Sequence, residues 1–183
     1  DVLDEPKPVT PTEWVSRGKA ALERGQFQQP YEGSLAEALD RLRSDDPSNE
    51  EIAKLRQEAA DVLLPKGLEQ VKAKQMEAAI DTFRKLRTVW PEHAQSTEPY
   101  IEALWDRMKR LRRKKDYGGT LAAADEILNL QPDNARVVVY KIGVLEIQQR
   151  WVDAYEAYQK LRELDPKNKN LRNRNFRRTK RRA

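Results

Sequence analysis

The sequence has 183 residues, of which 38% are hydrophobic and 36% are charged, and it contains no cysteine. Without cysteine the chain has no disulfide, no thiolate nucleophile and no cysteine-ligated metal. The near balance of apolar and charged residues disfavours a thick central core and favours a thin layer of helices, because each helix then keeps one face in water.

The net charge of +5 is unevenly distributed along the chain. Residues 167–183 carry nine Lys or Arg and no acidic residue, and without these nine the first 166 residues have a net charge of −4. The body of the chain is therefore mildly acidic and its end is strongly basic.

No segment has the roughly 18 consecutive apolar residues of a membrane-spanning helix. Residues 1–12 also lack the basic start and the apolar stretch of a signal peptide. We therefore expect no membrane span and favour a cytoplasmic location. The sequence begins at Asp1 rather than Met, so we expect a trimmed or processed chain that is a subunit or segment of a larger assembly.

Residues 1–12 contain three prolines and no apolar periodicity, which predicts a linker before a folded domain that begins at residue 13. A first helix is indicated by apolar and small residues at helical spacing, namely Trp14, Gly18, Ala21 and Leu22. Gly25 is expected to end this helix. After a loop at 28–34, helical spacing resumes at Leu35, Ala38, Leu39 and Leu42, and Pro47 stops the second helix.

The third helix is predicted to begin with a capping box, in which Ser48 and Glu51 satisfy each other's backbone N–H groups. Its apolar stripe is expected to consist of Ile52, Leu55, Ala59 and Val62. Pro65 and Gly67 then predict a kink or a break, because proline removes one backbone hydrogen bond and collides with the preceding turn.

The remaining helices show clearer apolar stripes. These stripes comprise Met76, Ala79, Ile80, Phe83 and Leu86; Ile101, Leu104, Trp105, Met108 and Leu111; Leu121, Ala124, Ile127 and Leu128; Val138, Ile142 and Leu145; and Ala154, Tyr158 and Leu161. The β-branched segment 137–140 could suggest a strand, but no partner strand is available, so a helix is predicted there as well.

A closing turn of the form apolar-x-Pro, with Val89, Leu130 or Leu164 as the apolar residue, recurs along the chain, and Asp45-Asp46-Pro47 is a looser, polar version. The turn ends at Pro47, Pro91, Pro132 and Pro166, at intervals of 44, 41 and 34 residues. The second residue after each proline is Asn49, His93, Asn134 or Asn168, which predicts a turn or cap role for His93 rather than a functional site.

These features resemble the tetratricopeptide repeat (TPR) family, whose units are helix-turn-helix pairs. The unit 135–168 matches best, with Trp151 in its turn followed by Ala154, Tyr158 and Pro166, and the unit 60–93 matches through Gly67, Ala79, Phe83 and Pro91. The unit 101–134 departs at Thr120, where a small Ala is expected, and at Ala124, where an aromatic residue is expected.

The resemblance covers residues 13–168. It implies an all-α, antiparallel helix-pair solenoid of about four repeats, followed by a basic C-terminal extension at 169–183. It also implies a non-catalytic scaffold that binds a protein or peptide partner on the concave surface formed by the first helices.

Carried over from the family, the groove-facing positions of the third and fourth units form the candidate binding site. They are Glu102, Trp105, Asp106, Lys109, Arg112 and Arg113 in the third unit, and Arg136, Val139, Tyr140, Gly143 and Ile147 in the fourth. The basic run 109–115 could hold a carboxylate-rich peptide, or it could be solvated charge at a helix C-terminus. Trp105 and Tyr140 could anchor a partner or simply fill space between helices.

The basic end of the chain offers an alternative function. Its cations are Arg172, Arg174, Arg177, Arg178, Lys180, Arg181 and Arg182. We expect it to start as a capping helix through Leu171 and Phe176 and to be too charged to pack beyond that point. It could bind nucleic acid or an anionic membrane together with the 109–115 cluster, or it could only keep the end of the repeat array solvated.

No catalytic, metal or cofactor site is predicted. Paired acids such as Asp45–Asp46 lie at helix ends, where negative charge is expected, and the isolated Gly118–Gly119 pair does not form a phosphate-binding loop. The sequence therefore predicts a binding module and not an enzyme.

Overall fold

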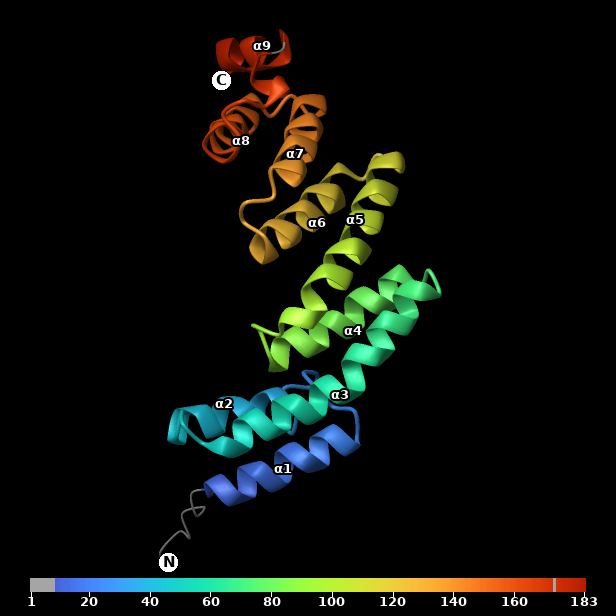
Figure 1. Ribbon diagram of the computed structural model, residues 1–183, viewed down its shortest axis with the longest axis vertical. Coiled ribbons are helices and arrows are strands. Elements are labelled where there is room, and N and C mark those ends of the chain that lie inside the picture. Colours follow the sequence, from blue (N-terminus) through green and yellow to red (C-terminus); the bar gives the residue numbers. More distant parts are fainter. Residues whose placement is uncertain (1–8, 173) are drawn as a thin grey trace, which may run out of the picture. The chain divides into compact units, whose positions relative to one another are not determined.

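The computed structural model describes residues 9–172 and 174–183, and over these residues the chain is all-α (Figure 1). The helices are α1 (Pro11–Glu23), α2 (Leu35–Asp45), α3 (Glu50–Lys72), α4 (Met76–Val89), α5 (Thr97–Arg113), α6 (Tyr117–Leu130), α7 (Ala135–Ile147), α8 (Trp151–Leu164) and α9 (Arg174–Arg182). Two short 3₁₀ helices, η1 (Ala94–Ser96) and η2 (Lys169–Arg172), accompany them. Of the linker predicted at 1–12, residues 1–8 lie outside the described part, and Pro11 and Thr12 belong to α1.

The chain divides into two compact units, unit 1 (Asp1–Ser96) and unit 2 (Thr97–Ala183). Unit 1 contains the antiparallel pairs α1–α2 and α3–α4. Unit 2 contains the pairs α5–α6 and α7–α8, followed by α9, which lies against α8. The helix-pair architecture expected from the sequence is therefore present.

The first helix of each pair ends with the same backbone conformation. Shortly after it, one residue is left-handed: Gly25, Lys74, Lys115 and Gln149 have φ between 59° and 67°, and the longer α1–α2 connection contains a further such residue, Gly33, at 74°. The N–H of the left-handed residue that follows the helix donates to the carbonyl three residues earlier, and the next N–H reaches back five residues, as in Gln75 to Gln70 and Arg150 to Leu145. This is the Schellman motif, which satisfies the last carbonyls of a helix.

The closing turns after each pair also share one geometry. An extended residue ends the second helix of every pair and stands directly before the repeated proline: Asp46, Trp90, Gln131 and Asp165. Its carbonyl accepts from the N–H of Asn49, His93, Asn134 or Asn168, at 3.0 to 3.2 Å. The repeat read from the sequence is thus a repeated turn, and the predicted turn role of His93 is confirmed.

The long helix α3 corrects three details of the sequence analysis. It is capped by Asn49, whose side chain accepts from the N–H of Glu51, while Ser48 bonds to the carboxylate of Asp46; the predicted Ser48 capping box is wrong. Val62 is 49% exposed, and Leu63 faces the core in its place. Pro65 does not break the helix, although the axis of α3 changes direction along its length in Figure 1, so a kink is present without a break.

The pair α3–α4 is held by close packing of Phe83 on Gly67. Phe83 is fully buried, and a β-carbon added at Gly67 would lie 2.5 Å from the Cε1 atom of its ring. The absence of a side chain at Gly67 therefore allows α3 and α4 to approach each other at this point.

The pair α5–α6 shows how one of its two departures from the repeat pattern, Thr120, is accommodated. Thr120 and Ala124 are fully buried, and the Thr120 hydroxyl donates to the carbonyl of Asp116. A hydroxyl that is satisfied within its own helix can occupy a buried position meant for alanine.

The pKa of His93 is lowered, first by burial and then by the charge of Arg87. The imidazole is 7% exposed and makes an edge contact with Trp90, with ring centroids 4.8 Å apart. Because the folded state disfavours protonation, the unfolded chain binds more protons once the pH falls below about 6.5, the usual value for histidine.

We therefore expect the stability of unit 1 to be constant above about pH 7 and to fall as the pH is lowered from about 6.5 towards 5. Replacing His93 with Asn, the residue found in the other three closing turns, should flatten this decline. Denaturant titrations of both proteins between pH 5 and pH 8 would check this, and an unchanged slope in His93→Asn would contradict it.

Candidate functional site

The predicted groove residues of unit 2 meet around two aromatic rings. Trp105 of α5 and Tyr140 of α7 are half-buried and pack edge to face, with centroids 5.7 Å apart and planes at 82°. Each ring belongs to the first helix of its helix pair. The two rings form a contact between α5 and α7 and also the wall of an open surface.

Three cations lie over these rings. The Lys109 Nζ atom is 5.8 Å and the Arg136 Cζ atom 4.8 Å from the centroid of Trp105, and the Arg112 Cζ atom is 4.7 Å from that of Tyr140. Such cation–π contacts hold a side chain in place while its N–H groups stay available to an anion. The two rings therefore orient the N–H donors of Lys109, Arg112 and Arg136.

A cavity of about 410 Å³, the α5–α7 cavity, opens beside this cluster. Its lining includes seven of the eleven predicted groove positions: Trp105, Lys109, Arg112, Arg136, Val139, Tyr140 and Gly143. The other four, Glu102, Asp106, Arg113 and Ile147, lie outside this lining. Arg113 is exposed, because one residue along a helix rotates a side chain by about 100° away from Arg112. A partner contact at each of these positions stays a prediction.

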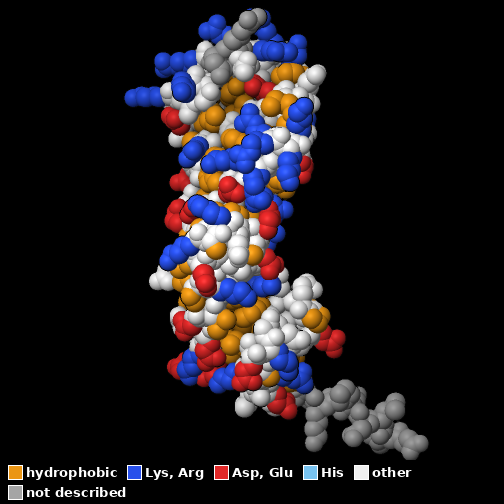
Figure 2. Space-filling model, turned by 90° about the vertical axis from the view of Figure 1, so that its right-hand side faces the viewer, with side chains coloured by type: hydrophobic (Ala, Val, Ile, Leu, Met, Phe, Trp, Pro, Cys, Tyr) orange, Lys and Arg blue, Asp and Glu red, His pale blue; other side chains and the backbone are white. Residues whose placement is uncertain are grey.

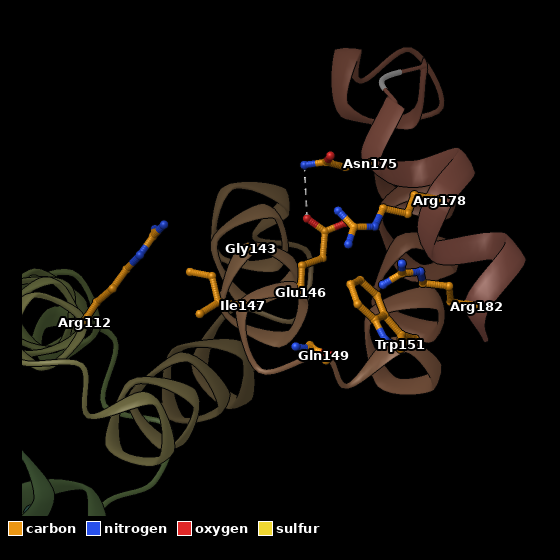
Figure 3. Close-up of a pocket in the computed structure, with 9 residues that line it drawn as sticks. All are labelled: Arg112, Gly143, Glu146, Ile147, Gln149, Trp151, Asn175, Arg178 and Arg182. Atoms are coloured by element: carbon orange, nitrogen blue, oxygen red, sulfur yellow. Dashed lines mark hydrogen bonds between the residues drawn. The ribbon is translucent and has the colours of Figure 1, made fainter.

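A second cavity, of about 460 Å³, lies where α7 and α8 meet α9, and we call it the α9 cavity (Figure 3). Arg178 and Arg182 of α9 project over Trp151, with Cζ atoms 5.3 and 4.9 Å from the centroid of its ring. Figure 3 shows Arg112 on the far side of the opening from α9. Three arginines thus surround one cavity.

Glu146 is the one carboxylate among the residues that line these two cavities in the described structure. Its oxygens accept from Tyr158 Oη at 3.1 Å, Thr179 Oγ1 at 2.8 Å and Asn175 Nδ2 at 3.4 Å. The carboxylate therefore joins α7, α8 and α9. Sequence analysis missed Glu146, because its role depends on partners 12 to 33 residues away.

The basic end of the chain packs more fully than predicted. Phe176 makes an edge contact with Tyr158, with centroids 5.1 Å apart, and Thr179 is fully buried. The expectation that the segment beyond Phe176 is too charged to pack is wrong, because the buried Thr179 has a partly buried acceptor in Glu146 and two arginines have an aromatic face in Trp151.

The predicted tail cations divide into two groups. Arg178 and Arg182 lie over Trp151 and are exposed, as are Arg172, Arg177, Lys180 and Arg181, which form the second group; the side chain of Arg174 lies outside the described residues. Figure 2 shows Lys and Arg side chains gathered over the part of the surface that belongs to unit 2. Trp151, which the sequence assigned only to the turn, also carries part of this basic surface.

Neither a metal-binding cluster nor a membrane span is found in residues 9–172 and 174–183. No three His, Asp or Glu side chains in this range are placed to hold a metal ion. None of the helices formed there is both long and apolar enough to cross a bilayer.

Similarity to known proteins is found among solved structures and is low. No protein-family model matches the sequence, and no curated protein matches it. Among solved structures, a MamA mutant has 18% identity over 85% of this chain and 98% of its own, with a TM-score of 0.36.

A tetratricopeptide repeat protein from Parabacteroides merdae has 12% identity over 87% of this chain and 55% of its own, with a TM-score of 0.39. A complex of the TPR2AB domain of yeast Sti1 with pHSP90 has 14% identity over 94% of this chain and 67% of its own, with a TM-score of 0.37. The fold class itself rests on the four helix pairs and their repeated turns.

Proposed function

We propose that this chain is a divergent TPR protein that acts as a non-catalytic interaction module and binds an acidic peptide on α5 and α7. The observation that supports this most directly is the arrangement of Lys109, Arg112 and Arg136 over the rings of Trp105 and Tyr140 at one cavity. The repeated closing turns support membership of the family.

Charge and preorganisation favour a carboxylate ligand in this cavity. Three cations and one acid line it, and that acid, Glu146, already accepts hydrogen bonds inside unit 2. A guanidinium that is already stacked loses less side-chain freedom when it binds, so more of each charge-assisted hydrogen bond contributes to affinity.

Charge reversal tests the proposal. The double variant Lys109→Glu with Arg112→Glu should weaken binding of a fluorescein-labelled Asp- and Glu-rich peptide by at least about tenfold, which corresponds to about 1.4 kcal/mol. Fluorescence anisotropy at about 50 mM and about 150 mM salt would measure the affinity, since screening should weaken it further.

The matched control is Arg113→Glu with Lys114→Glu. It makes the same charge change on exposed residues next to the cavity but outside its lining. Equal losses in both double variants would show that net charge alone attracts the peptide and would contradict a site at α5 and α7. Thermal melting of each variant would show that the fold is retained.

A second candidate function is binding of nucleic acid or an anionic membrane through α9 and the 109–115 cluster. The cations Arg177, Lys180 and Arg181 favour it, since they are exposed on the same helix as Arg178 and Arg182, which lie over Trp151. Titration with single- and double-stranded oligonucleotides and with anionic vesicles at two salt concentrations tests this function. Absence of binding at about 50 mM salt would exclude it.

A further inference from the structure

Gly143 occupies the interior of α7 without a packing reason. A β-carbon added at Gly18 or Gly67 would meet a neighbouring side chain at 3.1 or 2.5 Å, whereas one added at Gly143 meets nothing within 4 Å. Glycine is the poorest helix former apart from proline. The space over Gly143 therefore has to be explained by something other than the fold of unit 2.

That space joins the two cavities. Gly143, Arg112, Glu146 and Asn175 line both the α5–α7 cavity and the α9 cavity, which therefore adjoin along α7. Besides the shared Arg112, the α5–α7 cavity is lined by the cations Lys109 and Arg136, and the α9 cavity by Arg178 and Arg182. Cations thus lie on both sides of an uncovered stretch of helix backbone.

We infer that Gly143 is a specificity-determining residue, over which the main chain of an extended acidic peptide passes from the α5–α7 cavity to the α9 cavity. Acidic side chains of the peptide then reach cations at both ends, while the missing side chain lets its backbone approach α7. This inference rests on the proposed function and adds α9 to the binding surface.

The aromatic contacts favour a peptide over a nucleic acid at this surface. Binding of single strands depends on bases that stack on aromatic faces. Trp105 carries Lys109 and Arg136, Tyr140 carries Arg112, and Trp151 carries Arg178 and Arg182. Carboxylates need no ring face, because they bind the edges of the stacked guanidinium groups.

The test compares Gly143→Leu with Gly143→Ala in the full chain. The probes are fluorescein-labelled peptides with an Asp pair at both ends of a Gly-Ser spacer of varied length, and a control peptide with an Asp pair at one end. We expect wild type to prefer a peptide with two Asp pairs. We further expect Gly143→Ala to bind the peptide with two Asp pairs within about twofold of wild type. Gly143→Leu should bind it at least about tenfold more weakly, because the larger side chain occupies the space through which the peptide main chain passes; tenfold corresponds to about 1.4 kcal/mol.

The fold should survive both substitutions, because neither side chain meets a neighbour at its β-carbon and both residues favour helix over glycine. A melting temperature at or above that of wild type is therefore expected, which separates blocked binding from unfolding. If wild type, and not Gly143→Leu, prefers the peptide with two Asp pairs at one or more spacer lengths, this result would support passage of the peptide over Gly143.

Three outcomes overturn the inference in different ways. If Gly143→Leu binds the peptides as tightly as wild type, the inference is wrong and the proposed function stands. If wild type binds no acidic peptide at about 50 mM salt, the proposed function fails and takes the inference with it. If a single-stranded oligonucleotide competes with the peptide, binds more tightly and is lost in Gly143→Leu, the surface belongs to nucleic acid.

Discussion

Replacing Phe83 with alanine should lower the free energy of unfolding of unit 1 by about 3–5 kcal/mol, the usual range for removing a buried aromatic ring. Phe83 is fully buried, with a relative exposure of 0%, and its ring lies against α3 at Gly67. Guanidinium denaturation followed by circular dichroism would measure the change. Val62→Ala, at a position 49% exposed on α3, is the control and should change stability by less than about 0.5 kcal/mol.

Gly67 allows a sharper form of the same experiment. Alanine is about 1 kcal/mol better than glycine inside a helix, yet its β-carbon would lie 2.5 Å from Phe83 Cε1, so Gly67→Ala alone should destabilise unit 1 by about 1–3 kcal/mol. In the Phe83→Ala background the obstacle is gone, and Gly67→Ala should become neutral or stabilising. The same sign in both backgrounds would contradict this packing account.

Replacing Glu146 with alanine should weaken the packing of α9 against α7 and α8. The carboxylate accepts from Tyr158, Asn175 and Thr179, and Thr179 is fully buried, so the change leaves a buried hydroxyl without this acceptor. Hydrogen bonds to a charged group contribute about 1.5–3 kcal/mol each. Loss of even one should make α9 open at least about tenfold more often.

Limited trypsin digestion and hydrogen exchange would measure this opening, because α9 contains several arginines that become cleavable when it separates from α8. Glu163→Ala removes an exposed carboxylate from α8 and is the matched control. Unchanged protection of residues 174–182 in Glu146→Ala would show that Phe176 and the stacked arginines hold the helix without the carboxylate. Glu146→Gln, which keeps an acceptor oxygen, should show an intermediate effect.

Much of the fold could be predicted from local sequence signals. Helical spacing and the recurring prolines placed the four pairs, and the closing turns confirmed the register of Asn49, His93, Asn134 and Asn168. Helix caps were harder to predict where neighbouring polar residues compete for the same role. Asn49 displaced Ser48 as the cap of α3 because the Asp46 carboxylate binds the Ser48 hydroxyl and N–H.

The candidate site divides in the same way. The positions on α5 and α7 came from the resemblance to the TPR family, in which the first helix of each pair faces the groove. The contribution of α9 did not, because a segment with this many arginines reads as solvated until Trp151 and Glu146 are known to lie beside it. Partners that are distant in sequence cannot be found from spacing along one chain.

The Schellman turns inside the helix pairs have a consequence for how the chain reaches its structure. Each turn closes its hydrogen bonds within six residues, so each pair can form from nearby segments before it meets the next one. Local contacts lower the entropy lost before stabilising contacts are made, and chains rich in them fold quickly. The helix pair, rather than the single helix, is then the step in which this chain gains its order.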